Sequence, residues 1–331
     1  MAGYTALPGG YNLTRREILG KNEIMALHGR AVMLALAENE AVKRTLVQNG
    51  MSKGMVQRFV AGETLDDALA AARRLQTQNI NTALDLLGEN VATEAEASAS
   101  TNAYIGVLTA VAEAKLPAPY ISIKLTALGL DLSDELAAVN LTRILTAASA
   151  YPDALVRVDM EGSAYTQRTL DIVRAAHQDF GNVGTVLQSY LRRTDDDLAQ
   201  MNADGISVRL VKGAYAEPAS VAYPDKADVD AAYVRQMKEL LIHGHHPAIA
   251  SQDENILRQA KRFVREQRIE NSRFEFQMLL GIRRDLQEAL AAEGYFVRAY
   301  VPFGVSWYPY FMRRLAERPA NIGFVLKNLV K

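Results

Sequence analysis

The sequence predicts a (β/α)8 barrel with a helical extension in front of it. From about residue 82, short runs typical of β-strands alternate with helical patterns rich in Ala, Leu and charged residues. Eight such runs over roughly 250 residues match the number and span of a (β/α)8 barrel. A doubly wound open sheet is the alternative that this alternation leaves open.

The composition narrows the class of protein. The chain has 331 residues, and barrels of this length are often single domains. Its 37 basic and 38 acidic side chains give no sign of binding to nucleic acid or an anionic membrane. The absence of cysteine excludes disulfides, thiolate metal sites and cysteine nucleophiles. We find no transmembrane stretch or signal peptide, and we therefore expect a cytoplasmic protein.

Three segments are predicted along the chain. Residues 1–20 contain scattered Gly and Pro and are expected to form a flexible arm. Residues 21–80 are predicted to be helical, because Leu65, Ala68 and Leu69 begin an amphipathic stripe that continues to Leu75. Residues 81–331 are predicted to form the barrel. Its expected strands are residues 83–89, 120–126, 155–161, 185–190, 206–213, 248–253, 274–280 and 297–304.

Several of these strands carry polar residues on one face. In the second strand, Ser122 and Lys124 alternate with apolar residues, and in the third Arg157 and Asp159 do the same. In a barrel the apolar face must lie against the helices, so the polar face points inward. An unpaired charge buried there would cost several kcal/mol. The sequence therefore predicts a large polar ligand inside the barrel.

Lys124 lies near the end of its strand, where barrel enzymes carry their chemistry. It could be a Schiff-base nucleophile, a cation that binds an anion, or one half of an internal salt bridge with Asp159. Pairing with Asp159 would keep the ammonium charged, whereas a Schiff base requires a neutral amine. This favours carboxylate binding over nucleophilic catalysis.

The segment after the fifth strand concentrates residues suited to a flat, charged ligand. Arg209 and Lys212 supply positive charge, and Tyr215 offers a ring for stacking. Gly213 and Ala214 allow close approach to the backbone. Separately each is an ordinary loop residue, but together they indicate a binding site.

The last predicted helix carries Arg313, Arg314 and Glu317 on adjoining faces, just after Tyr300. A solvated helix with Arg313 paired to Glu317 is the plain interpretation. However, the apolar stripe of this helix is too weak for the outer ring of a barrel. We therefore predict a lid over the barrel mouth that binds an anion.

The histidines suggest no metal site. The chain has five, namely His28, His177, His243, His245 and His246. The last three lie between a helix end and the next strand, which in a barrel is the face opposite the active site. Histidine is also favoured at a helix C-terminus by the helix dipole.

Several motifs in order resemble those of the flavin-dependent proline dehydrogenases, most closely the short monofunctional bacterial form. The similarity runs from about residue 59 to the C-terminus. The motifs are FVAGE (59–63), DLLGE (85–89), SIKLT (122–126), RVD (157–159), QSY (188–190), RLVKGAY (209–215), FEFQML (274–279) and the segment 300–317.

The resemblance implies a distorted barrel that binds FAD without a Rossmann domain, and a last helix over the strand ends. It implies oxidation of L-proline to 1-pyrroline-5-carboxylate, with a membrane quinone reoxidising the flavin. It also leads us to expect peripheral contact with the inner face of the membrane. Because the sequence shows no aldehyde dehydrogenase domain, we expect a separate pyrroline-5-carboxylate dehydrogenase to use the product. A Schiff-base aldolase using Lys124 is the alternative function.

Site residues follow from the resemblance, position by position. The implied catalytic residues are Lys124, Asp159, Tyr300, Arg313 and Arg314. The implied substrate contacts are Lys124, Ala214, Tyr215, Leu279, Tyr300, Arg313 and Arg314. The implied cofactor contacts are Arg157, Gln188, Arg209, Lys212, Gly213, Ala214, Ser251, Gln252 and Glu275. Glu89 is expected to pair with Arg313 as a gate. This chain has Ser251 and Gln252 where relatives often have Thr and His.

Overall fold

The computed structural model describes residues 56, 58–116 and 119–316. Within this range, Val56–Trp307 forms one compact unit, and the chain from Tyr308 onward belongs to a second unit. The last helix is therefore described by itself. The predicted arm, the predicted helices before residue 56 and Glu317 lie outside the described residues.

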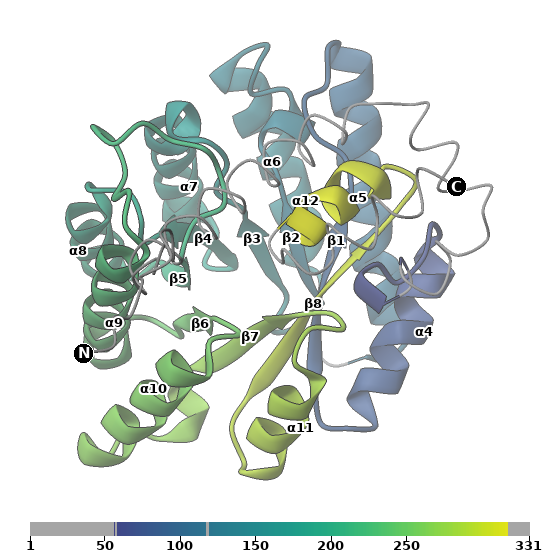
Figure 1. Ribbon diagram of the computed structural model, residues 1–331. Coiled ribbons are helices and arrows are strands. Elements are labelled where there is room, and N and C mark those ends of the chain that lie inside the picture. The colour runs from purple at the N-terminus through teal and green to yellow at the C-terminus, as the bar shows by residue number, and fades with distance from the viewer. Residues whose placement is uncertain (1–55, 57, 117–118, 317–331) are drawn as a thin grey trace, which may run out of the picture. The chain divides into compact units, whose positions relative to one another are not determined.

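Eight parallel strands close into a barrel in sequence order (Figure 1). Strand β8 pairs with β1 along six positions, from Asn81 opposite Arg298 to Leu86 opposite Phe303. This closure confirms the predicted barrel and excludes the open doubly wound sheet. The strands are β1 Asn81–Leu86, β2 Tyr120–Ile123, β3 Leu155–Val158, β4 Val183–Gln188, β5 Ser207–Val211, β6 Ala248–Ala250, β7 Glu275–Leu279 and β8 Val297–Phe303.

A helix follows each strand, as the sequence predicts for a (β/α)8 barrel. The helices are α4 Leu65–Gln76, α5 Glu94–Glu113, α6 Asp134–Ala148, α7 Thr166–Asp179, α8 Thr194–Ala203, α9 Lys226–His243, α10 Glu254–Glu266, α11 Arg284–Ala292 and α12 Trp307–Ala316. Short 3-10 turns are η1 Thr126–Leu128, η2 Ser163–Tyr165 and η3 Asn271–Arg273.

Side-chain caps fix where several helices begin. Thr64 caps α4 by accepting a hydrogen bond from the Asp67 N–H, and the Asp67 carboxylate accepts one from the Thr64 N–H in return, which is a capping box. Thr93 and Glu96 do the same for α5. Each cap satisfies backbone N–H groups that have no partner inside the helix, which is worth about 1 kcal/mol.

Helix α4 completes the outer layer at the seam of the barrel. It comes before β1 in the chain, and it packs against both β1 and β8 (Figure 1). Helix α4 therefore takes the place in the outer ring of helices that a helix after β8 would otherwise fill. The predicted boundary between residues 80 and 81 falls inside the compact unit Val56–Trp307.

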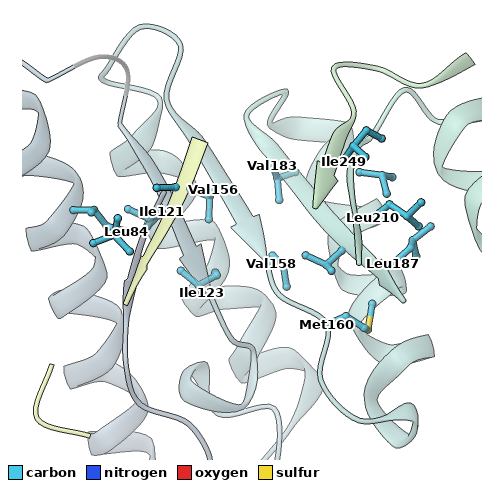
Figure 2. Close-up of a cluster of buried hydrophobic side chains, with 14 of the residues drawn as sticks. Leu84, Ile121, Ile123, Val156, Val158, Met160, Val183, Leu187, Leu210 and Ile249 are labelled. Atoms are coloured by element: carbon cyan, nitrogen blue, oxygen red, sulfur yellow. The ribbon is translucent and has the colours of Figure 1, made fainter. Parts of the chain in front are cut away.

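The apolar core lies between the strands and the surrounding helices. Leu84, Ile121, Val156, Leu210 and Ile249 point outward from five of the strands and are almost fully buried (Figure 2). Burying each such side chain contributes about 1.5–3 kcal/mol to stability. Because strand side chains alternate, the opposite face points into the barrel. That inward face is polar, as predicted, and it forms the site described next.

Candidate active site

The carboxyl ends of the strands bring the main predicted site residues to one end of the barrel. Lys124 lies just beyond β2, Asp159 just beyond β3, and Lys212 just beyond β5. Gln188 is the last residue of β4, and Tyr300 lies within β8. In a parallel barrel these positions share one end, which is where such folds place their chemistry.

Lys124 is held by Asp85, a residue of β1. Its Nζ lies 3.3 Å from Oδ1 of Asp85, and both side chains are buried. The prediction that Lys124 pairs directly with Asp159 is wrong, because the Asp159 carboxylate is bonded to Arg209 and Tyr300 instead. Strand β2 has β1 on one side and β3 on the other, so an inward residue of β2 can meet either neighbour. The sequence did contain a sign of this partner, since Asp85 is the one acidic residue in the otherwise apolar run 83–87 of the first strand.

The environment of Lys124 keeps its ammonium protonated. Burial alone would lower its pKa, but the carboxylates of Asp85 and Asp159 together raise the pKa well above its ordinary value. A charged ammonium is a poor nucleophile and a good ligand for an anion. The interpretation of Lys124 as a carboxylate-binding cation is therefore the one that its surroundings favour.

Asp159 holds one cation and one phenol. Its Oδ1 accepts a hydrogen bond from Arg209 Nη1 at 2.7 Å, and its Oδ2 accepts one from the Tyr300 hydroxyl at 2.7 Å. The Arg209 guanidinium also donates to Ser122 Oγ at 3.0 Å and to Gln277. It lies 5.2 Å from the centre of the Tyr300 ring. Side chains from four other strands thus surround this one guanidinium and fix its orientation.

The Tyr300 phenol stays protonated. Burial raises its pKa well above the ordinary value, and the nearby carboxylates of Asp159 and Asp85 raise it further. The hydroxyl is therefore a hydrogen-bond donor to Asp159 at physiological pH. We call Asp85, Lys124, Asp159, Arg209 and Tyr300 the carboxyl-end cluster.

Gln188 presents a buried acceptor beside this cluster. Its Nε2 donates to the carbonyls of Met160 and Glu161, each at 3.0 Å. Its Oε1 is buried, and among the described residues it has no hydrogen-bond partner. A buried acceptor of this kind is costly unless a bound molecule supplies a donor. Gln188 therefore fits a ligand that carries an N–H or O–H group.

Lys212 is anchored by two aspartates. Its Nζ lies 2.5 Å from Asp230 and 2.9 Å from Asp253, the residue that also caps α10. The neighbouring Gly213 has a φ of 115°, and a Cβ there would lie 2.2 Å from the Tyr190 ring. Only glycine fits at this position, because the backbone directly after Lys212 passes close to the Tyr190 ring. Ala214 and Tyr215 continue the same loop.

Arg157 and Glu275 lie at the other end of the barrel interior. Arg157 donates to the Tyr120 hydroxyl and to Ser207 Oγ, both at 2.9 Å, from a guanidinium that is 1% exposed. Glu275 accepts from Arg298 Nε at 3.0 Å on each oxygen. These five residues form what we call the amino-end network. Their placement separates Arg157 and Glu275 from the carboxyl-end cluster, which argues against the prediction that they join the cofactor site.

A cavity of about 780 Å³ opens at this same end. First residues of strands line it, including Asn81 and Tyr120, and so do His177, His245 and His246. This placement confirms the predicted position of His245 and His246 on the face opposite the predicted active site, and His177 lies there with them. Among the described residues, no group of three His, Cys, Asp or Glu side chains could hold a metal ion.

The remaining predicted residues are spread over three places. Leu279 ends β7, and Ser251 and Gln252 follow β6, where Ser251 Oγ accepts from the Asp253 backbone at 3.1 Å. Arg313 and Arg314 lie on α12, where the Arg314 guanidinium is 5.4 Å from the Tyr310 ring. The gate between Glu89 and Arg313 stays a prediction.

A search of the described helices for one both long and apolar enough to cross a bilayer finds none.

The fold and this site define a (β/α)8 barrel protein with a cluster of buried, mutually bonded charged residues at the carboxyl ends of its strands. Comparison with known proteins points to one family. The family model described as "Proline dehydrogenase" matches residues 68–327. The chain therefore belongs to the proline dehydrogenase family.

Individual relatives support this assignment over nearly their whole length. The chain is 43% identical to Proline dehydrogenase 1 of Bacillus subtilis (strain 168), covering 91% of this chain and 99% of that one. It is 42% identical to Proline dehydrogenase of Deinococcus radiodurans, covering 91% and 98%.

Among solved structures, it is similar to proline utilization A (PutA) from Bdellovibrio bacteriovorus inactivated by N-propargylglycine. The TM-score is 0.75 at 25% identity. The match covers 81% of this chain and 33% of that one, so it concerns about one third of the larger protein.

Proposed function

We propose that this protein oxidises L-proline to 1-pyrroline-5-carboxylate with FAD as the hydride acceptor, the first step of proline catabolism to glutamate. Membership of the proline dehydrogenase family supports the reaction. The observation that carries it is the carboxyl-end cluster, in which a charged lysine and an oriented tyrosine lie beside a fixed guanidinium. This arrangement suits a ligand with one carboxylate and one small ring.

The substrate carboxylate is assigned to Lys124, Arg313 and Arg314. A carboxylate prefers charged hydrogen-bond donors, and paired guanidinium groups fix its orientation as well as its position. Fixing the carboxylate orients the ring carbon that loses hydride, which is a large part of the rate enhancement available to such an enzyme.

The ring of the substrate is assigned to Tyr300, Leu279, Ala214 and Tyr215. Tyr300 is suited to this role because Asp159 accepts its hydroxyl hydrogen at 2.7 Å and so fixes the plane of the phenol. Rings of this kind give an apolar wall of defined shape.

The residues present fit FAD. Gln188 Oε1 is a buried acceptor that a flavin N–H would satisfy. Gly213 is proposed as a contact through its backbone, which the Tyr190 ring packs against on the side where a Cβ would stand. Arg209 and Lys212 supply the positive charge that phosphates and a reduced flavin require. Ser251 and Gln252, which follow β6, are proposed as further contacts. When bound, the flavin supplies N5 as the hydride acceptor.

Glu89 and Arg313 are proposed to form a gate over the bound substrate. An ion pair that forms only when the site is closed would hold substrate and exclude water at the moment of reaction. The support for this pair is the resemblance of the motif DLLGE (85–89) and of the segment 300–317 to the family.

A quinone is the proposed oxidant of the reduced flavin, and a separate pyrroline-5-carboxylate dehydrogenase the proposed user of the product. Both follow the family resemblance, as does peripheral contact with the inner face of the membrane. The aldolase alternative is not supported, because the chain belongs to a dehydrogenase family and Lys124 is held in its charged form.

Anaerobic mixing of the purified protein with L-proline tests the proposal. We expect a yellow protein whose flavin absorbance bleaches with L-proline and not with an equal concentration of D-proline. If L-proline bleaches neither the protein as purified nor the protein reconstituted with FAD, the proposed reaction is overturned. Covalent trapping by borohydride with a carbonyl substrate would instead favour the aldolase.

A further inference from the structure

Asp85 is a buried charge that the proposed reaction leaves without a role. Its side chain is 1% exposed, and its nearest cationic partner is Lys124 Nζ at 3.3 Å. An acid buried to this degree costs several kcal/mol unless its charge is compensated. A residue retained at such a cost invites a specific explanation.

We propose that Asp85 is the positioning residue for Lys124, holding the ammonium charged and aimed at the substrate carboxylate. This inference rests on the proposed function, because it assigns Asp85 a part in binding the same carboxylate. It divides the work of the two buried aspartates: Asp85 serves the substrate side, and Asp159 serves Arg209 and Tyr300.

The barrel wall fixes Asp85 firmly enough for this role. Strand β1 lies between β8 and β2, and Asp85 is in register with Pro302 on one side and Ser122 on the other. Its backbone is therefore held by two neighbouring strands. Lys124 follows the end of β2 and carries a long, flexible side chain, so it gains most from a fixed partner.

Asp159 cannot serve Lys124 in the same way. Both of its carboxylate oxygens accept hydrogen bonds at 2.7 Å, one from Arg209 and one from Tyr300. It contributes to the field around Lys124 but makes no direct bond to it among the described contacts. Asp85 has one oxygen on Lys124, and its Oδ2 has no hydrogen-bond partner among the described residues.

A competing effect gives the test a definite sign. Burial raises the pKa of Asp85, while the Lys124 ammonium lowers it. In its charged form Asp85 would repel an anion at the proposed carboxylate site, so repulsion alone would make its removal strengthen anion binding. If Asp85 instead maintains the charge and direction of Lys124, its removal weakens anion binding. The two effects are opposite, and one measurement separates them.

The experiment uses the FAD-loaded protein and tetrahydrofuran-2-carboxylate, a ring carboxylate that has no amine to oxidise. We expect Asp85→Asn to bind it about tenfold more weakly by calorimetry, the size of effect that one pKa unit of differential interaction produces. The KM for L-proline should rise by more than kcat falls. Unchanged or tighter binding by Asp85→Asn overturns the inference.

A double-mutant cycle shows whether Asp85 acts through Lys124. In a Lys124→Met background, Asp85→Asn should change the affinity for tetrahydrofuran-2-carboxylate less than twofold, because the residue it positions is gone. An equal loss in both backgrounds overturns the inference. Asp159→Asn is the comparator, and it should reduce kcat more than it weakens the analogue.

Two further variants distinguish a loss of folding from a loss of binding. The double variant Asp85→Asn with Lys124→Met removes both charges and leaves no unpaired ion. If Asp85→Asn does not fold, Asp85→Glu is used, since it keeps the charge at a shifted position. Weaker analogue binding by Asp85→Glu with an unchanged melting temperature supports positioning, whereas wild-type affinity opposes it.

The outcome is separable from that of the proposed function. If wild-type protein does not bleach with L-proline, the proposed reaction has failed. If the wild type bleaches and Asp85→Asn binds the analogue as tightly as the wild type does, only the role of Asp85 has failed.

Discussion

The two ends of the barrel interior use similar residues for different purposes. At the amino end, Arg157 and Arg298 are matched by Tyr120, Ser207 and Glu275 in a network of bonds within the protein. At the carboxyl end, equally buried charges coexist with acceptors that have no partner among the described residues. The first pattern stabilises the fold, whereas the second leaves buried groups whose hydrogen bonds a bound ligand would complete.

The comparison shows that an inward charge does not by itself indicate a binding site. What separates the amino-end network from the carboxyl-end residues is whether the hydrogen-bonding capacity of the buried groups is satisfied by the protein. The distinction applies to the network and not to the cavity beside it, where His177 Nδ1 and Asn182 Oδ1 are also buried without a partner among the described residues. Gln188 Oε1 and Asp85 Oδ2 lack such partners at the carboxyl end. Function is therefore expected where satisfaction is incomplete, and the predictions below test this division.

The largest expected effect is on stability at the amino end. Arg157→Met leaves several buried acceptors without a donor, and it should lower the free energy of unfolding by about 3–5 kcal/mol. Chemical denaturation measures this loss. Arg235→Met is the matched control, because the Arg235–Asp195 pair is about half exposed and should change stability by less than about 1 kcal/mol.

The same Arg157 variant also tests the placement of that residue. Its folded fraction should retain FAD with wild-type affinity, since the side chain is directed to the amino end. Loss of FAD from protein that is still folded would contradict this placement and restore Arg157 to the cofactor site.

A loss of similar size is expected at the carboxyl end, in binding rather than in folding. Arg313→Met should weaken L-proline binding by about 2–5 kcal/mol, as when one partner of a buried charged pair is removed. The measurement is KM together with the affinity for tetrahydrofuran-2-carboxylate. A near-normal KM would contradict the assignment of Arg313 to the substrate carboxylate.

Removing one hydroxyl should have a smaller effect. Tyr300→Phe keeps the ring but deletes the bond to Asp159, and hydrogen bonds to charged groups are worth about 1.5–3 kcal/mol. We expect kcat/KM for L-proline to fall by about 10- to 100-fold. Tyr151→Phe, at the amino-end cavity, is the control, and it should leave kcat/KM unchanged.

The sequence predicted which face of each strand points inward, because side chains alternate with a period of two. It did not predict depth along the barrel axis. Arg157 and Lys124 share the inward face, but Arg157 is in register with Ser122, two residues before Lys124, and its long side chain reaches back to Ser207 at the start of β5. Partner choice was also beyond the pattern, since an inward residue of β2 has acids on both neighbouring strands, Asp85 and Asp159.

The smallest expected effect concerns the dependence of stability on pH. Burial opposes the shift, but hydrogen bonds from Lys212 lower the pKa of both Asp230 and Asp253 below 3.8. A lowered folded pKa stabilises the protein above the unfolded pKa, and this contribution disappears as pH falls through the folded pKa.

Lys212→Met should therefore lower stability by about 1 kcal/mol at pH 7, since the pairs are partly exposed. The difference from wild type should shrink as pH falls below about 4. Thermal melting at several pH values measures this. A difference that stays constant across the range would exclude the ion pairs as its source.

The seam of the barrel sets a condition on how this chain can be made. Arg298 of β8 donates to the Thr82 carbonyl of β1, and 216 residues separate them. The edge of β1 that pairs with β8 therefore stays unpaired until nearly the whole barrel has been synthesised. Such distant pairing slows folding and exposes a strand edge to other chains. Helix α4, made just before β1 and packed on it, is available to shelter the outer face of that strand during the delay.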